Sequence, residues 1–433
     1  MLKILANAYA CCPRMGSEPG MGWNWVSSLA RHCELHVITE EEFRPQIEEA
    51  VRWPEGQEQG TNAYGLTRGQ CANLHFHWNP VAPEVRRMCW NQGDWRFYRH
   101  YRLWQERTAR MARDICRATR IDILHQLNMI GFREPGYLWQ VSRETGIPFV
   151  WGPIGGMKQF PLPYLQGAGL KMRLFMTLKN IINLAQIKFD RRVRQALRQA
   201  CLLVASIPES QTALRKHHGR ESVIIPETGC FPLHGAERPT EAAEAPLRLL
   251  WVGKYDFRKQ LPTALRAVAQ ARASRPDCRV ELQVCGTGNP RQVAEAQALV
   301  RDLRIGDAVR FRGQLSTPEV WALMRQCHLF FFTSISEDTS TVVLEAISNR
   351  LPVLCHNICG MAHVVDERVG CKVAVTNPQQ SVQDFAEAIL HFHDHREELA
   401  RLSANCPQVA EELSWENKAR QMARLYTEAI QKA

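Results

Sequence analysis

Several features that would assign this 433-residue chain to a special class are missing. No apolar run reaches the roughly 18 residues that a membrane-spanning helix requires. The opening residues, MLKILANAYACC, lack a long apolar segment with a small-residue cleavage site, so they indicate a first strand and not a signal peptide. The composition, 45% apolar and 23% charged, is typical of globular proteins. We therefore expect a cytoplasmic protein.

Paired cysteine motifs are missing as well. The 15 cysteines are scattered and include no Cys-x-x-Cys, which in a chain of this kind favours reduced, buried thiols. Cys355, His356, Cys359 and His363 form a cluster that could suggest a metal, but their spacing is not that of a zinc finger. The sequence therefore predicts no metal site there.

Acidic residues are too few in one half of the chain to balance its cations. Residues 1–240 hold 31 Lys and Arg against 21 Asp and Glu, whereas residues 241–433 hold 23 of each. The net charge of +10 therefore belongs entirely to the first half. A basic half joined to a neutral half predicts two domains with different partners, one of them anionic.

Short apolar strands alternate with helical segments in both halves, a pattern typical of βα units and parallel sheets. In the first half we expect strands at Leu2–Ala8, Glu34–Thr39, Leu74–Trp78, Asp122–Gln126, Pro148–Gly152, Leu202–Ser206 and Ser222–Pro226. In the second half we expect strands at Arg248–Gly253, Arg279–Gly286, Val309–Gly313, Leu329–Ser334 and Leu351–His356, then helices from Ser381 to Ala433. The stretch Pro232–Pro246 between the halves, rich in Pro, Gly and charge, indicates a linker. In such sheets, ligands bind at the carboxyl ends of the strands.

The turn after the first strand reads GSEPGMGWNW (Gly16–Trp25). Its glycines let backbone N–H groups turn toward a ligand, and the following helix offers its positive end, which suits phosphate or sugar oxygens. It is not a Walker loop, since no Gly-Lys-Ser/Thr follows, and its glycine spacing is not that of a dinucleotide fingerprint. A flexible turn without a ligand is the alternative.

A basic turn, VGKYDFRKQ (Val252–Gln260), follows the first strand of the second half. Lys254, Arg258 and Lys259 crowd a strand end, where cations could neutralise a diphosphate leaving group without a metal. A solvated basic loop is the alternative. The position at the first strand of a new sheet favours the phosphate site.

The segment EDTSTVVLE (Glu337–Glu345) follows a buried strand and carries two carboxylates eight residues apart. Thr339, Ser340 and Thr341 offer caps and backbone amides at the start of a helix, which favours an anion there. Glu345 lies in the first or second turn of that helix, within reach of hydroxyl groups on a bound ligand.

Together these motifs resemble those of a known family. GSEPGMGWNW, WGPIGG (Trp151–Gly156), the VGK turn, CGTG (Cys285–Gly288), VRFRG and EDTSTVVLEA match, in order and spacing, the retaining nucleotide-sugar glycosyltransferases of family 4. The resemblance extends from Leu2 to the final helices. It implies an α/β architecture, the GT-B fold, in which two Rossmann-like domains face each other across a cleft.

The resemblance implies a role for each domain. Residues 1–235 would form the acceptor-binding domain and residues 247–405 the nucleotide-sugar donor-binding domain. Residues 406–433 would form a helix that crosses back to the N-terminal domain.

The resemblance also implies roles for single residues. Glu345 matches the glutamate that bonds the donor's ribose, and Glu337 matches the glutamate near the donor sugar. His125 resembles a histidine that faces the transferred sugar, with a purely structural histidine as the alternative. Lys254 and Lys259 would hold the diphosphate, and Thr339, Ser340 and Thr341 would lie under the phosphates. Arg312 would lie near the base. The other residues expected to bind the donor are Gly16, Ser17, Gly253, Gly286 and Gly288.

The sequence departs from the family's commoner pattern at four places. Lys254 replaces an arginine, Gln260 a glycine, and Asp338 the glycine after the first glutamate, while Cys359–Met361 stands where Gly-Gly-x-x-Glu is frequent. A lysine cannot grip a diphosphate with two parallel hydrogen bonds as arginine does. These changes leave the activity in place and the identity of the donor sugar open.

The expected chemistry follows from charge. Glycosyl transfer passes through an oxocarbenium-like state while negative charge grows on the leaving diphosphate. The basic pair and the helix N-terminus would stabilise that charge, so we expect neither a metal nor another cofactor. In the family, retention is explained by attack on the same face, with the leaving phosphate accepting the acceptor's proton.

Two basic segments suggest a partner surface. Residues 84–120 hold ten arginines interleaved with aromatic residues, and residues 171–198 hold eight basic residues against Asp190 alone. The second segment predicts a basic amphipathic helix on an anionic membrane surface, with a helix packed on its own domain as the alternative. Nucleic-acid binding is disfavoured because no RRM, KH or zinc module is present.

The sequence therefore predicts a retaining glycosyltransferase that moves a sugar from a nucleotide-sugar donor to a saccharide acceptor. We expect a lipid-linked acceptor, in exopolysaccharide or lipopolysaccharide biosynthesis, at the inner face of the cytoplasmic membrane. Transfer to a soluble small molecule is the alternative, and a basic nucleic-acid-binding protein is the alternative from another class.

Overall fold

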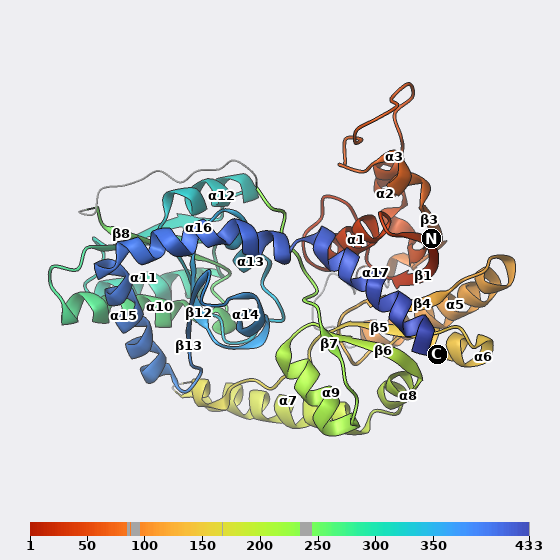
Figure 1. The fold of residues 1–433 in the computed structure, drawn as a ribbon. Coiled ribbons are helices and arrows are strands. Elements are labelled where there is room, and N and C mark those ends of the chain that lie inside the picture. The colour runs from red at the N-terminus through yellow and green to blue at the C-terminus, as the bar shows by residue number, and fades with distance from the viewer. Residues whose placement is uncertain (85–86, 88–95, 167, 234–244, 433) are drawn as a thin grey trace. The chain divides into compact units, whose positions relative to one another are not determined.

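The computed structural model describes residues 1–84, 87, 96–166, 168–233 and 245–432. The chain divides into two compact units (Figure 1). Unit 1 comprises Met1–Lys158, Ile182–Glu227 and Trp415–Ala433, and unit 2 comprises Gln159–Ile181 and Thr228–Ser414. Most of the expected linker, at 234–244, lies outside the described residues.

Unit 1 is built on a seven-stranded sheet in the order β3-β2-β1-β4-β5-β6-β7. All its neighbouring strands run parallel, as the alternation of strands and helices predicts. The strands are β1 Leu2–Ala8, β2 Cys33–Glu40, β3 Leu74–Asn79, β4 Ile123–Asn128, β5 Phe149–Ile154, β6 Ala200–Ala205 and β7 Val223–Ile224. The strand order reverses between β1 and β4, the position at which doubly wound sheets bind ligands.

The helices of unit 1 cover this sheet. They are α1 Ser17–Leu29, α2 Arg44–Val51, α3 Arg68–Ala72, α5 Arg96–Ala118, α6 Leu138–Thr145, α8 Arg191–Gln199, α9 Pro208–His218 and α17 Trp415–Lys432. The last helix, α17, lies beside α1 in Figure 1 and packs against it. Because α17 belongs to unit 1, the chain's final residues complete the unit that its first residues begin.

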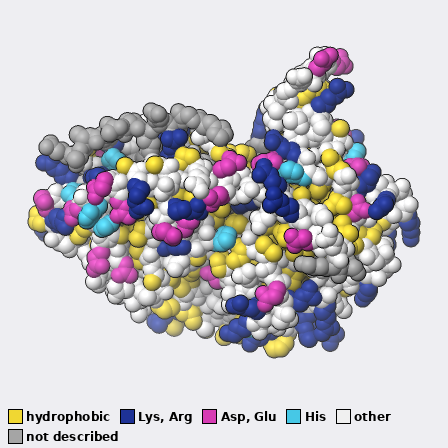
Figure 2. Space-filling view, viewed as in Figure 1, with side chains coloured by type: hydrophobic (Ala, Val, Ile, Leu, Met, Phe, Trp, Pro, Cys, Tyr) yellow, Lys and Arg dark blue, Asp and Glu magenta, His cyan; other side chains and the backbone are white. Residues whose placement is uncertain are grey.

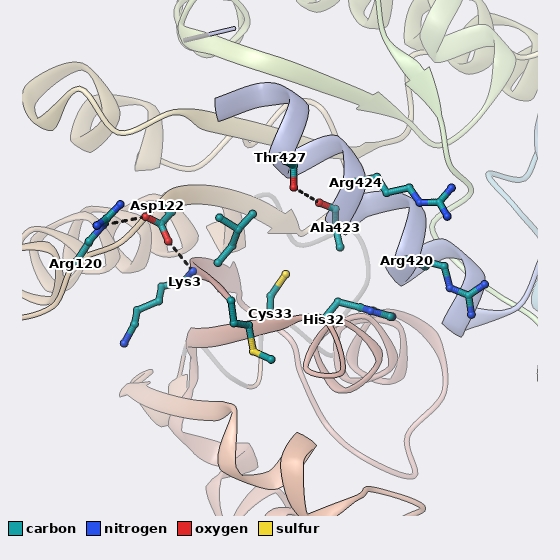
Figure 3. A pocket seen from close by; sticks show the side chains of 11 residues that line it. Lys3, His32, Cys33, Arg120, Asp122, Arg420, Ala423, Arg424 and Thr427 are labelled. Atoms are coloured by element: carbon teal, nitrogen blue, oxygen red, sulfur yellow. Dashed lines mark hydrogen bonds and ion pairs between the residues drawn. The ribbon is translucent and has the colours of Figure 1, made fainter. Parts of the chain in front are cut away.

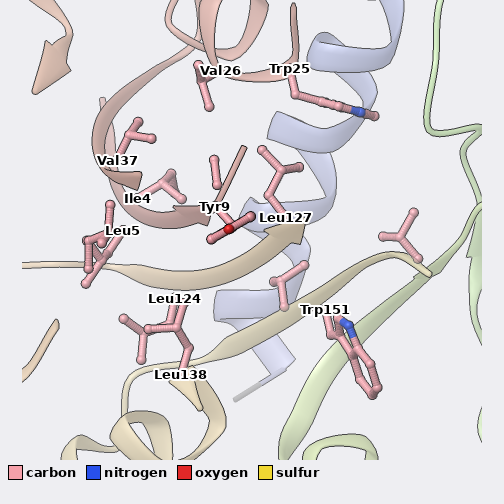
Figure 4. Packing of buried hydrophobic residues seen from close by; sticks show 14 of the residues in the cluster. Ile4, Leu5, Tyr9, Trp25, Val26, Val37, Leu124, Leu127, Leu138 and Trp151 are labelled. Atoms are coloured by element: carbon pink, nitrogen blue, oxygen red, sulfur yellow. The ribbon is translucent and has the colours of Figure 1, made fainter. Parts of the chain in front are cut away.

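Aliphatic strand residues and large aromatic residues form the core of unit 1 (Figure 4). Ile4 and Leu124, from adjacent strands, are fully buried beneath the helices. Trp25 of α1 and Trp415 of α17 meet edge to face with ring centroids 5.9 Å apart. The indole N–H of Trp25 donates to the Glu227 carbonyl at 2.9 Å, so this buried ring keeps a polar partner.

Unit 2 is built on a six-stranded parallel sheet in the order β10-β9-β8-β11-β12-β13. Its strands are β8 Leu247–Val252, β9 Val280–Cys285, β10 Val309–Gly313, β11 Leu329–Phe332, β12 Val353–His356 and β13 Gly370–Val373. Its helices are α10 Leu261–Ser274, α11 Pro290–Asp302, α12 Thr317–Gln326, α13 Thr341–Ser348, α14 Cys359–Val364, α15 Pro378–Asp394 and α16 Arg396–Glu412. Here the order reverses between β8 and β11.

The limits of the two units differ from the domain limits expected from the sequence, which were at residues 235, 247 and 405. The two units part after Glu227 and after Ser414, and residues 159–181 belong to unit 2. Packing explains that last assignment: Phe160 stacks on Phe257 with centroids 6.0 Å apart, and the Tyr164 hydroxyl bonds His356 at 3.2 Å. The helix α7, Leu170–Phe189, therefore begins in unit 2 and ends in unit 1.

The strand predictions are confirmed with shifts of a few residues at their ends. Only β13 is missing from them, because a four-residue edge strand carries too little hydrophobic pattern to be recognised. The helix after β1 begins at Ser17, within the segment expected as a glycine-rich turn. Among the residues that the structure describes, no helix is long and apolar enough to cross a membrane.

Candidate functional site

Two segments expected to bind the donor lie where β8 and β11 end side by side. The turn after β8 and the segment after β11 are joined by backbone contacts. The N–H of Ile335 donates to the Arg258 carbonyl at 2.9 Å, and Thr333 Oγ1 donates to the Lys259 carbonyl at 2.8 Å. The structure therefore brings together two motifs that are about 80 residues apart in the sequence, at the point where the strand order reverses.

Lys259 and Glu337 form an ion pair across these two segments. The Lys259 ammonium lies 2.8 Å from Glu337 Oε1, and both side chains are largely buried. The hydroxyl of Ser334 also donates to Glu337 Oε1, at 3.0 Å. Lys259 further lies 4.8 Å above the centre of the Phe332 ring. Both groups are thus fixed in position at the strand ends.

The other two cations of the turn are more exposed. Arg258 pairs with Asp256 at 3.0 Å, while the exposed Lys254 has no ion-pair partner among the described residues. Asp256 also accepts hydrogen bonds from the backbone N–H groups of Arg258 and Lys259 and so shapes the turn. Lys254 is therefore the cation of this turn that is available to a ligand.

A cavity of about 570 Å³ opens at the same edge of unit 2, within the size range of small-molecule sites. Four expected residues line it: Gly253, Lys254, Gly286 and Gly288. Arg312 is not part of the lining; its guanidinium donates to Gln283 at 2.7 Å on β9.

The glycines of this cavity are required by close backbone approach. Gly286 has φ of 120°, a region that L side chains rarely adopt, and a Cβ there would overlap the Gly253 carbonyl oxygen. A Cβ on Gly288 would lie 2.9 Å from Tyr255 Cβ. The two glycine turns therefore stack directly on each other.

The start of α13 presents an uncapped helix end. Ser340 is the N-cap residue, its side chain caps no backbone N–H, and the first turn holds no acidic residue. Thr339 and Ser340 are buried, whereas Thr341 is exposed. A Cβ on Gly360 would crowd the Thr339 side chain, so Gly360 allows α14 to approach this end. An uncapped helix N-terminus favours an anion.

Glu345 lies half-buried in α13, in surroundings that disfavour its charge. Burial raises its pKa, and the indole of Trp321 opposes the shift without forming a hydrogen bond of ordinary geometry. Hydroxyl groups of a ligand would supply the donors that this carboxylate lacks and would lower its pKa again.

In unit 1, Gly16 and Ser17 are exposed at the carboxyl end of β1 and begin α1. Ser17 adopts a φ of 55°, an uncommon value for a residue with a side chain. The Glu18 carboxylate already lies at the N-terminus of α1, where it accepts a hydrogen bond from the Ile130 N–H at 2.8 Å. This helix end is therefore less suited to an anion than that of α13.

His125 does not lie at a strand end. β4 extends to Asn128, so His125 is in mid-strand, fully buried between β1 and β5. Its Nε2 donates to the Gly152 carbonyl at 2.7 Å, and its Nδ1 accepts from the Tyr426 hydroxyl at 2.6 Å. Both ring nitrogens are engaged in hydrogen bonds, which supports the structural alternative, and the catalytic role stays a prediction.

A second cavity, of about 700 Å³, lies in unit 1 at the amino ends of β1, β2 and β4 (Figure 3). Arg120 pairs with Asp122 at 3.2 Å, and Asp122 also accepts from the Lys3 backbone N–H at 2.9 Å. Arg420 and Arg424 of α17 line it too. The amino ends of parallel strands are not where such sheets bind substrates, so this cavity is separate from the candidate site.

Sequence reasoning missed the residues that support the site. Ser334 orients Glu337, Trp321 faces Glu345, and Gly360 makes room for Thr339. Ser334 and Gly360 lie next to recognised motifs, so their position was a usable signal. Trp321 lies on another helix, and only the fold brings it to Glu345.

The comparisons with known proteins agree with this architecture. At 14% identity, the structure of Anabaena Alr3699/HepE in complex with UDP matches with a TM-score of 0.59 over 99% of this chain and all of that chain. The apo lipopolysaccharide outer core galactosyltransferase WaaB matches at 12% identity with a TM-score of 0.61, over 98% of this chain and all of that chain. These likenesses establish the fold: two parallel-sheet α/β domains of the GT-B type.

Sequence comparison points to the same class for the second half of the chain. Residues 236–409 match the family described as Glycosyl transferases group 1. The chain is also 30% identical, over 190 residues, to D-inositol 3-phosphate glycosyltransferase of Thermobispora bispora, a match that covers 42% of this chain and 44% of that protein. The chain spans about half the length of the curated relatives it matches.

Replacing Gly286 tests the stacking of the two glycine turns. Gly286→Ala should lower the free energy of unfolding of unit 2 by about 1–3 kcal/mol, because it strains the backbone and forces a methyl group into the Gly253 carbonyl. Gly306→Ala is the control, since a Cβ there meets nothing within 4 Å. Urea unfolding measures both; equal stability of the two variants would contradict the close approach.

Acid should destabilise both units. Burial lowers the pKa of His125 in unit 1 and of His356 in unit 2 to about 4, from 6.5. Between pH 6.5 and 4 the unfolded state binds more protons than the folded state, so stability is lost as pH falls through this window. Each histidine accounts for about 3 kcal/mol at the acid end. Urea unfolding at a series of pH values measures the loss, and a flat profile from pH 6.5 to 5 would contradict it.

Proposed function

We propose that this protein is a retaining glycosyltransferase that transfers a sugar from a nucleotide-sugar donor to a saccharide acceptor. The observation that carries the proposal is the meeting of Lys259, Glu337 and the uncapped start of α13 at the strand-order reversal of unit 2. Cations and the backbone amides of a helix N-terminus at that position suit a diphosphate. Acceptor binding is assigned to unit 1.

Charge stabilisation at the leaving group is the main catalytic contribution we assign to unit 2. Lys254 and Lys259, with the N-terminus of α13, would offset the negative charge that grows on the diphosphate as the glycosidic bond breaks. We propose that these groups take the place of a metal. Because Lys259 is already held by Glu337 and Phe332, little reorganisation is needed when the charge develops.

Glu337 and Glu345 are assigned different tasks. Glu337, fixed by Lys259 and Ser334, would orient the donor sugar at the reacting carbon. Glu345 would accept hydrogen bonds from the ribose hydroxyls. Retention would follow from attack on the face that the diphosphate leaves, with a phosphate oxygen taking the acceptor's proton. His125 is given no part in the reaction.

The donor base we propose to test first is uracil. One protein with this fold, Anabaena Alr3699/HepE, has been solved with UDP, with UDP and glucose, and with UDP-glucose, which makes a uridine nucleotide the first candidate here. The cavity lined by Gly253, Gly286 and Gly288, of about 570 Å³, lies within the size range of small-molecule sites.

A lipid-linked acceptor is supported by the surface of α7. Figure 2 shows hydrophobic and basic side chains together along the lower edge, where α7 lies in Figure 1. Only Asn183 and Ile187 of this helix are buried. Its exposed apolar residues are Leu170, Met172, Leu174, Phe175, Leu178, Ile181, Ile182, Leu184 and Phe189. Exposed apolar residues mixed with lysine and arginine suit the interface of an anionic membrane.

The other basic segment, residues 84–120, is less suited to a membrane surface than α7. In α5, Tyr101 and Trp104 are buried and pack edge to face on Tyr9, while Arg102 and Arg113 form ion pairs. Trp90 and Trp95 lie outside the described residues. The aromatic residues described in α5 thus belong mainly to the core, which weakens both the membrane role of residues 84–120 and the nucleic-acid alternative. We therefore limit the membrane surface to α7.

A soluble acceptor is the second candidate. The relative from Thermobispora bispora is named for D-inositol 3-phosphate, a soluble phosphorylated polyol. The basic character of unit 1 would also suit a phosphorylated acceptor. A lipid-linked saccharide in exopolysaccharide or lipopolysaccharide assembly remains our first choice, because a soluble acceptor leaves the exposed apolar side of α7 without a function.

Donor binding is tested by thermal shift and calorimetry with UDP, GDP, ADP and their common sugars, with and without magnesium. One nucleotide should stabilise the protein without metal, by about 2.7 kcal/mol at a hundredfold excess over Kd. Glu345→Ala should weaken that binding about tenfold to a hundredfold by removing a charged acceptor. Glu387→Ala, on the exposed side of α15, is the control. Wild-type affinity and turnover in Glu345→Ala would contradict the ribose assignment.

Membrane contact is tested by sedimentation with vesicles that contain an anionic lipid. The double variant Phe175→Ser and Leu178→Ser should lose most vesicle binding, since both side chains are more than half exposed on α7. Phe231→Ser removes an equally exposed aromatic residue elsewhere and should bind as the wild type does. Equal binding by all three proteins would show that α7 is not the contact surface.

A further inference from the structure

Three histidines and a glutamate share one face of the sheet edge in unit 1. Glu34 and His36 are alternate residues of β2, and His75 and His77 are alternate residues of the neighbouring edge strand β3. The strands pair in parallel with His36 opposite His75 and Ile38 opposite His77. Because side chains alternate between faces along a strand, all four project to the same side. None of them belongs to the proposed donor site.

The ligand atoms of three of these residues already lie at the separations that a metal would require. His75 Nε2 is 3.4 Å and His36 Nε2 is 3.7 Å from the same oxygen, Glu34 Oε1. All three atoms lie within 4.8 Å of one another. Ligand atoms about 2.0–2.1 Å from a tetrahedral zinc ion lie about 3.3–3.4 Å apart. Only small rotations of the side chains would bring the three atoms onto one ion.

His36 is prepared for such a role by its neighbour. Its Nδ1 shares a hydrogen bond of 3.1 Å with His77 Nε2, and its buried Nε2 has no hydrogen-bond partner among the described residues. A histidine that binds a metal through one nitrogen usually donates from the other to a fixed acceptor. His77 therefore acts as the orienting partner of His36, and the unpaired nitrogen points toward Glu34 and His75.

We propose that Glu34, His36 and His75 form a binding site for a divalent zinc ion, with His77 holding His36 in position. Two imidazoles and a carboxylate are ligands that zinc accepts, and the exposure of His75 leaves a fourth position for water. The site would join the edge strand β3 to β2 and so stabilise the edge of unit 1. It is structural and separate from sugar transfer.

The Lys3 ammonium supplies the positive charge beside Glu34 that the metal ion would replace. This ammonium lies 3.0 Å from Glu34 Oε1, and the Lys3 side chain is 37% exposed, so it can swing into solvent when an ion binds. Metal binding therefore displaces one ammonium from Glu34.

The test uses the full chain after treatment with a chelator. Zinc should bind saturably and raise the melting temperature, and cobalt(II) should give the visible bands of a tetrahedral site without the near-ultraviolet bands of thiolate ligands. His75→Gln, at an exposed position, should weaken zinc at least about tenfold, since even outer-shell changes cost that much. His391→Gln is the matched control, because His391 also bonds a glutamate, Glu398 at 2.6 Å, but belongs to no three-ligand group found in the described residues.

Each outcome of this test either supports the zinc site or overturns it. Weakened binding in His75→Gln with normal binding in His391→Gln supports the site. Equal zinc affinity in His75→Gln and the wild type overturns it, as does the absence of saturable binding. Thiolate bands with cobalt would assign the metal to the cysteines and also overturn it. Glycosyl transfer is measured in parallel, and its presence or absence bears only on the proposed function.

Discussion

The pairing of β8 with β11 is the constraint on which the candidate site depends. These strands lie side by side although the chain between them forms two other strands and three helices. Their carboxyl ends therefore open at the same point, and the segments that follow are tied together by Thr333, Ile335 and the Lys259–Glu337 ion pair. The charge arrangement proposed for the diphosphate exists only because this pairing is made.

Within that arrangement, the carboxylates of Glu337 and Glu345 behave differently. One carboxylate oxygen of Glu337 is held by both a lysine and a serine, whereas Glu345 is half-buried without a strong donor. A satisfied carboxylate holds its neighbours in place, and an unsatisfied one gains from a ligand's hydroxyl groups. This contrast supports the separate roles proposed for them more strongly than their spacing does.

Unit 1 shows how a basic, aromatic-rich composition can be divided between core and surface. Tyr101 and Trp104 of α5 are buried, and Arg102 and Arg192 pair with the buried Glu134, so these residues stabilise the unit. In α7, by contrast, most of the apolar residues remain exposed. The histidines of β2 and β3 add a cluster whose members come from two strands and whose geometry suits a metal.

The sequence by itself determined the α/β class, nearly all strands and the motifs at their ends, because hydrophobic alternation and glycine turns are local signals. It did not place His125, since the end of β4 differs by two residues and that shift moves the histidine from a strand end into the core. The partners of Glu345 and the cluster of Glu34, His36 and His75 were decided only by the tertiary structure. Their members lie on separate elements, and strand register and helix packing alone bring them within contact distance.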